Sequence, residues 1–205
     1  MPNLIASRRQ ISLRVVYAGP GVGGKTTNLR QIQAQFPEFR MAELATAGER
    51  TLGGDFLPVA LGAERVDGWE LKLSLSSVPG QIQYADSRAS VLKAADVIVF
   101  VADSHPLRQQ ANLYALDDVR ALLAAEGREP GGVPLVFQYN KCDLPDAIPP
   151  EELDARLNPA GAPAVAAVAL DGVGVFETLA EALDLAVAEA RRYLARAMPP
   201  RAASA

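Results

Sequence analysis

The chain has 205 residues, of which 49% are hydrophobic, and its formal net charge is −4. The apolar fraction is enough for a sizeable core, while the acidic balance and the absence of a Lys/Arg block argue against non-specific nucleic-acid binding. One cysteine, Cys142, rules out an intramolecular disulfide, and the polar start at residues 1–10 resembles neither a signal peptide nor a membrane span.

The N-terminal half begins with a predicted strand at 11–18, a glycine-rich loop and a predicted helix at 26–36. Weak periodicity and two adjacent glycines then predict a mobile loop at 38–54. The next two apolar segments, at 55–61 and 69–75, surround a turn and predict a β-hairpin. We therefore expect the chain to enter a sheet before its first long helix.

The C-terminal half alternates helical periodicity with short apolar runs of strand length. In chain order we expect a helix at 83–95, a strand at 97–102, a helix at 107–126, a strand at 133–139, a short helix at 151–157, a strand at 164–170 and a helix at 174–197. The alternation predicts an α/β fold: a mostly parallel six-stranded sheet with one antiparallel hairpin and helices on both faces. We expect a single domain over residues 1–198, a disordered tail at 199–205, and a cytoplasmic protein.

Residues 19–26 carry the most specific motif, which is Gly, four residues, then Gly-Lys-Thr between a strand and a helix. Glycines let successive N–H groups converge on a phosphate, and the helix N-terminus adds partial positive charge. Lys25 can reach the β- and γ-phosphates, and the Thr26 hydroxyl can ligate Mg²⁺. The predicted phosphate-binding residues are Gly19, Gly21, Val22, Gly23, Gly24, Lys25, Thr26 and Thr27.

An Asn-Lys-Cys-Asp tetrad follows the predicted strand at 133–139 and indicates which base is bound. The Asp143 carboxylate can accept two hydrogen bonds from guanine, whereas adenine offers no such donor pair. Asn140 can tie this loop to the phosphate loop or contact the base edge, and the Lys141 stem can cover one face of the base. Ala169 and Leu170 end the last predicted strand at the same edge, where Ala169 would offer a backbone N–H to guanine O6.

With these motifs in place, the sequence resembles the Ras-like small GTPases, and most closely their bacterial MglA branch. The resemblance runs from about residue 11 to about residue 195. It is carried by the segments 17–21, 24–29, 49–52, 55–58, 78–81, 138–141 and 174–179. The Pro-Gly-Gln at 79–81 and the Phe-Leu-Pro at 56–58 are the features that favour the MglA branch.

The resemblance implies two switch segments, at 42–54 and 79–90, which respond to the γ-phosphate. Thr51 would ligate Mg²⁺ and touch the γ-phosphate, and Gly80 would offer the same phosphate its backbone N–H. For hydrolysis, Gln81 would position the attacking water and Arg50 would stabilise charge in the transition state. GTP or GDP with Mg²⁺ is therefore the implied ligand, and a Roadblock-domain activator of the MglB kind is the implied partner.

Two departures from the family pattern leave an alternative open. Ser77 stands where most Ras-like proteins have an Asp and the MglA branch usually has Thr, so Mg²⁺ could be held more loosely. Gly53 and Gly54 replace an expected pair of bulky aromatic residues and would loosen the first switch. The alternative is a guanine-nucleotide-binding module that does not hydrolyse GTP and serves as a scaffold. A third class, an ATP-dependent small-molecule kinase, is disfavoured because the Asp143 carboxylate matches guanine and not adenine.

Overall fold

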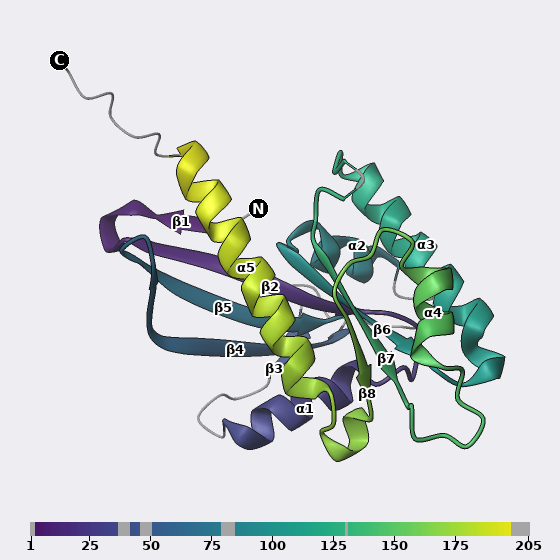
Figure 1. Ribbon diagram of the computed structural model, residues 1–205. Helices are drawn as coiled ribbons and strands as arrows, with labels where there is room; N and C mark the ends of the chain where they lie inside the picture. The colour runs from purple at the N-terminus through teal and green to yellow at the C-terminus, as the bar shows by residue number, and fades with distance from the viewer. Residues whose placement is uncertain (1–2, 37–41, 46–50, 79–84, 130, 198–205) are drawn as a thin grey trace.

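A computed structural model describes residues 3–36, 42–45, 51–78, 85–129 and 131–197; side chains of 42–45, 51–56, 59–65 and 85–87 are not described. These residues form one sheet with helices on both faces (Figure 1). The strands are β1 (Asn3–Ile5), β2 (Gln10–Ala18), β3 (Ala42–Ala45), β4 (Thr51–Val66), β5 (Trp69–Ser77), β6 (Val97–Asp103), β7 (Leu135–Asn140) and β8 (Ala164–Ala167). The α-helices are α1 (Lys25–Gln35), α2 (Ala85–Lys93), α3 (Gln109–Ala125), α4 (Pro150–Leu157) and α5 (Val175–Ala197).

The strand order is β3-β4-β5-β2-β6-β7-β8, with β1 paired to the start of β2. Strand β2 lies parallel to both β5 and β6, and the parallel arrangement continues through β7 to β8. The expected hairpin is the antiparallel pair β4–β5. The α/β prediction with a mostly parallel sheet is therefore confirmed, and the carboxyl ends of β2, β6, β7 and β8 share one edge.

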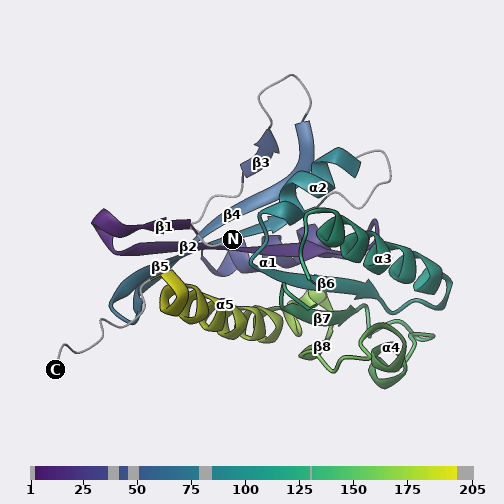
Figure 2. The ribbon, with the colours of Figure 1, turned by 90° about the horizontal axis from the view of Figure 1, so that it is seen from above.

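The sheet separates two apolar cores, because successive strand residues point to opposite faces. On one face, Val15 and Tyr17 of β2 pack with α1 and α5. On the other face, Val16 and Ala18 pack with α2, α3 and α4. Figure 2 shows α5 and α3 on opposite sides of the sheet. The central strand β6 is fully buried, as expected for a parallel strand covered on both faces.

The structure corrects three sequence predictions. The described part of the chain contains eight strands rather than six, because β1 and β3 add antiparallel edges. The prediction of a loop at 38–54 is wrong in the two parts of this segment that the structure describes. Residues 42–45 form β3, and β4 begins at Thr51. Pairing between β3 and β4 supplies backbone hydrogen bonds that local periodicity cannot reveal. The predicted strand at 164–170 is also too long: β8 ends at Ala167, and a 3₁₀ helix, η4 (Ala169–Asp171), follows.

No described helix is both long and apolar enough to cross a lipid bilayer. The predicted tail at 199–205 lies outside the described residues.

Candidate functional site

The loop between β2 and α1 has a backbone that requires glycine at two positions. Gly19 has φ +133° and Gly24 has φ +109°, both in the left-handed region. A Cβ on Gly19 would lie 2.2 Å from the Val101 carbonyl oxygen, and one on Gly24 would lie 2.1 Å from Asn140 Nδ2. The loop is therefore pressed against β6 and against the end of β7, which fixes its curvature.

The loop leads directly into the N-terminus of α1. The Asn28 N–H donates to the Gly24 carbonyl at 3.0 Å, which is the first bond of the helix. The first N–H groups of an α-helix point out of its end rather than toward a carbonyl of an earlier helical turn. Together with the helix dipole, they make this end of α1 suitable for an anion.

Lys25 is buried beneath the loop, with 7% of its surface exposed. Its Nζ donates to the carbonyl oxygens of Gly19 at 2.9 Å and Pro20 at 2.6 Å. Burial lowers the pKa of Lys25 to about 8, and the positive charges of Arg88 and Arg108 contribute in the same direction. Among the described residues, the partners of this buried ammonium are neutral carbonyls, which leaves its charge uncompensated at a cost, so the loop favours an anionic ligand.

Asn140, at the end of β7, ties three segments together. Its Nδ2 donates to the Gly23 carbonyl at 2.8 Å, and its Oδ1 accepts from the Ala169 N–H at 2.8 Å. The predicted tie between the Asn140 loop and the phosphate loop is therefore present. The Ala169 N–H, which we expected to serve guanine O6, is already engaged with Asn140; the N–H of Leu170, whose residue is 78% exposed, is the neighbouring donor.

Lys141 adopts a left-handed backbone, with φ +70°, and its Nζ lies 2.6 Å from Asp103 Oδ2. This ion pair fixes the Lys141 stem across the edge of the sheet. Asp143 follows in the same loop and is exposed. The structure thus brings the predicted base-binding residues Asn140, Lys141, Asp143 and Ala169 to one edge with the phosphate loop.

A buried polar network behind the loop was not anticipated from the sequence. Asn28 and Gln138 exchange two hydrogen bonds, of 2.7 and 2.9 Å, and Gln138 Nε2 donates to the Thr178 hydroxyl at 2.8 Å. Asn28 Nδ2 also donates to the Gly24 carbonyl at 3.0 Å. The network joins α1, β7 and α5, so it holds the start of α1 rigidly. The sequence signal that could have indicated this network is the polar Gln138 within the mainly apolar strand β7.

The residues predicted to hold Mg²⁺ are described only in part. Thr26 lies in the first turn of α1, and Ser77, which is buried, ends β5 beside the end of β2. Thr51 begins β4, but its side chain is not described. Within the described residues no cluster of three or more His, Cys, Asp or Glu could hold a metal. Hydroxyl oxygens such as that of Thr26, together with phosphate oxygens, are hard ligands that suit Mg²⁺.

The three remaining predicted residues, Arg50, Gly80 and Gln81, lie outside the described residues. Their roles stay predictions.

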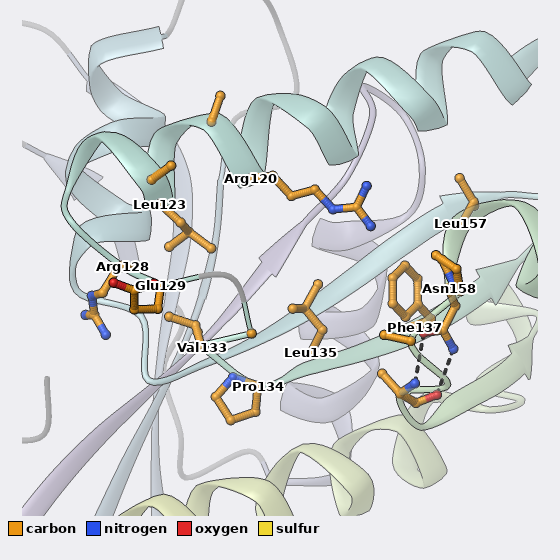
Figure 3. A pocket seen from close by; sticks show the side chains of 16 residues that line it. Arg120, Leu123, Arg128, Glu129, Val133, Pro134, Leu135, Phe137, Leu157 and Asn158 are labelled. Carbon is orange, nitrogen blue, oxygen red and sulfur yellow. Dashed lines mark hydrogen bonds between the residues drawn. The ribbon is translucent and has the colours of Figure 1, made fainter.

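A separate pocket of about 720 Å³ lies between α3, β7 and α4 (Figure 3). Its lining is mainly apolar and includes Leu123, Val133, Phe137 and Leu157. None of the predicted site residues lines it. The pocket and the phosphate loop are therefore different features of the molecule.

No family model matches the chain. The chain is 43% identical over 189 residues to the mutual gliding-motility protein MglA of Myxococcus xanthus (strain DK1622), and the match covers 91% of this chain and 96% of that protein. It is also 26% identical over 140 residues to the Ras-related protein RABG3c of Arabidopsis thaliana, covering 68% of this chain and 63% of that protein.

Proposed function

Because the chain belongs to the MglA branch of the Ras-like small GTPases, we propose that its sheet edge holds GTP between the phosphate loop and the Asn140 loop. The protein is a small GTPase switch that binds GTP or GDP and hydrolyses GTP. The observation that carries this placement of the nucleotide is the buried Lys25, whose ammonium faces the inside of the glycine loop.

The phosphates would lie against the loop backbone. Phosphate oxygens would replace the carbonyls of Gly19 and Pro20 as partners of Lys25 Nζ, which gives that ammonium the negative charge it lacks. The N–H groups that would surround the phosphates belong to Gly21, Val22, Gly23, Gly24, Lys25, Thr26 and Thr27. Pre-formed glycine geometry and the Asn28 network reduce the ordering needed on binding.

Guanine would lie above the end of β7. The exposed Asp143 carboxylate would accept from its N1–H and exocyclic amine, and the Lys141 stem would cover one face. Guanine O6 would accept from the N–H of Leu170, or from that of Ala169 if Asn140 releases it. Asn140 would act chiefly as the tie between the base loop and the phosphate loop.

Hydrolysis would depend on the two switches. Thr26 and Thr51 would hold Mg²⁺, which when bound neutralises charge on the β- and γ-phosphates. Gln81 would orient the attacking water, Arg50 would stabilise charge spreading over the γ-phosphoryl oxygens, and Gly80 would donate its N–H to the γ-phosphate. Loss of that phosphate would release Thr51 and Gly80 together, which makes the response a switch.

We further propose that the protein works as one domain over residues 1–198 in the cytoplasm, with a Roadblock-domain activator of the MglB kind. The relative named for gliding motility motivates a role in motility or cell polarity. The activator would bring Arg50 and Gln81 into register with the γ-phosphate.

No observation favours the non-hydrolysing alternative. Its motivation was a first switch loosened by Gly53 and Gly54, but both glycines lie within strand β4. Residues Thr51, Asp55 and Phe56 on either side of them pair with β3. The strand is therefore paired on both sides of the glycines, with a register shift in β3 between Glu43 and Ala45 opposite them.

Single-turnover hydrolysis tests the proposal. Purified protein loaded with GTP and Mg²⁺ is expected to produce GDP slowly alone and faster with a Roadblock partner. A Lys25→Ala variant is the matched control and is expected to lose nucleotide binding. Turnover of GTP by neither the protein alone nor the mixture would contradict the proposal.

A further inference from the structure

Arg108 reaches the phosphate loop from a distant part of the sequence. It is the last residue of the 3₁₀ helix η3 (Pro106–Arg108), which connects β6 to α3. Its Nη2 donates to the carbonyl oxygen of Gly21 at 2.7 Å. Gly21 lies in the middle of the loop, so this contact braces the loop from a side chain outside it.

A rigid carboxylate holds Arg108 in this position. Arg108 Nε lies 3.7 Å from Asp103 Oδ2, and the Asp103 side chain is only 1% exposed. The other oxygen, Oδ1, accepts from the His105 N–H at 3.1 Å. Asn112 bonds both the N–H and the carbonyl of Asp103, each at 2.9 Å. The guanidinium is therefore pre-positioned without a ligand.

The charges around the loop do not balance. Asp103 is shared between Lys141, at 2.6 Å, and Arg108. Lys25 adds a third cation, and residues 19–26 contain no acidic side chain. The positive charge of Arg108 repels the Lys25 ammonium and so contributes to the lowered pKa of Lys25. Among these four groups there is a surplus of positive charge beside the loop, which a phosphate chain would neutralise.

The hydrogen-bonding capacity of Arg108 is not used up by Gly21. Among the described residues, the buried Nε of Arg108 has no hydrogen-bond partner, because Asp103 Oδ2 is 3.7 Å away, and about a third of the side chain, 35%, is exposed. A guanidinium presents five N–H donors in a planar fork that matches phosphate oxygens. The side chain can thus keep its bond to Gly21 while its exposed part stays available to a phosphate chain beside the loop.

We propose that Arg108 is a positioning residue of the phosphate site, which braces Gly21 and adds positive charge so that binding strengthens with each phosphate on the nucleotide. This inference rests on the proposed function, because it presumes that the loop holds guanine nucleotides. Arg108 is distinct from Arg50, since Arg108 comes from the β6–α3 connection and is already in contact with the loop. Its effect falls on nucleotide affinity and release.

The test measures displacement of a fluorescent GDP analogue by GMP, GDP and GTP. Arg108→Met keeps the side-chain stem but removes the fork and the charge, and Arg108→Lys keeps only the charge. The matched control is Arg120→Met, which removes an arginine that lies on α3 and pairs with Asp117. Thermal unfolding and circular dichroism of every variant establish that it is folded.

For Arg108→Met we expect GTP affinity to fall about tenfold, as for loss of a charged hydrogen-bond donor, with a smaller loss for GDP and the smallest for GMP. Arg108→Lys should retain most of the dependence on phosphate number, and Arg120→Met should match the wild type. An equal loss for all three nucleotides, or no loss, would overturn the inference, as would a Lys variant no better than Met. Failure of the wild type to bind GTP would instead refute the proposed function.

Discussion

Replacing Asn140 with alanine tests whether its side-chain amide holds the phosphate loop and the base-binding loop together. The substitution removes two buried hydrogen bonds, to the Gly23 carbonyl and from the Ala169 N–H, each 2.8 Å long. Each bond contributes about 1 kcal/mol net, and each partner left buried without a bond costs about 1–3 kcal/mol. With two such partners, the Gly23 carbonyl and the Ala169 N–H, we expect the free energy of unfolding to fall by roughly 2–6 kcal/mol.

Asn158 provides a matched control far from the site. It is also buried, and its amide likewise donates one bond to the backbone and accepts another, since Nδ2 donates to the Ala162 carbonyl at 2.8 Å and Oδ1 accepts from the Ala162 N–H at 2.9 Å. Its Nδ2 also donates to Asp154 Oδ1 at 2.9 Å. The two bonds to Ala162 appear as dashed lines in Figure 3. Asn158→Ala should therefore destabilise the fold by a similar amount without touching either nucleotide loop.

Urea unfolding followed by circular dichroism gives the two stabilities, and release of a fluorescent GDP analogue gives the functional effect. We expect Asn140→Ala to accelerate release about tenfold or more, whereas Asn158→Ala leaves it unchanged. Equal acceleration by both variants would mean that the effect is general loss of stability. Unchanged release in Asn140→Ala would show that the tie between the loops has no role in holding nucleotide.

Three further substitutions test separate parts of the site. Asp143→Asn should weaken GTP binding and create affinity for xanthine nucleotide, because the amide N–H donates a hydrogen bond where the carboxylate oxygen accepted one. Calorimetry with both nucleotides measures the two affinities. Gln81→Leu should leave GTP binding intact and slow single-turnover hydrolysis about tenfold or more, because no side chain then positions water. Gly24→Ala should abolish nucleotide binding, because its Cβ would lie 2.1 Å from Asn140 Nδ2 in a backbone with φ +109°. A variant that binds GDP normally would show that the loop can change its backbone conformation at little cost.

The parts of the molecule that sequence predicts well are those with local signals. The glycine loop, the start of α1 and the tetrad at the end of β7 all depend on neighbouring residues, and the structure places them as expected. The alternation of strands and helices likewise follows from short-range periodicity. It was sufficient to predict the sheet and its shared edge.

The features that could not be predicted depend on contacts between distant residues. Strand β3 forms because 42–45 pair with the beginning of β4, and β1 forms against the start of β2. Asp103 and Arg108 join the site only because η3 lies against the phosphate loop, 87 positions away from Gly21. The position of a lone acidic residue at the end of an apolar strand was the available signal for Asp103, although the sequence analysis did not single it out, whereas Arg108 had no comparable local signal.

The central claim is that a glycine loop holds a triphosphate while a carboxylate on the same edge selects guanine. Titration calorimetry of nucleotide-free protein with GTP and with ATP, both with Mg²⁺, tests it most directly. We predict strong binding of GTP and binding of ATP weaker by several orders of magnitude. Equal affinities for the two nucleotides, or binding of neither, would contradict it.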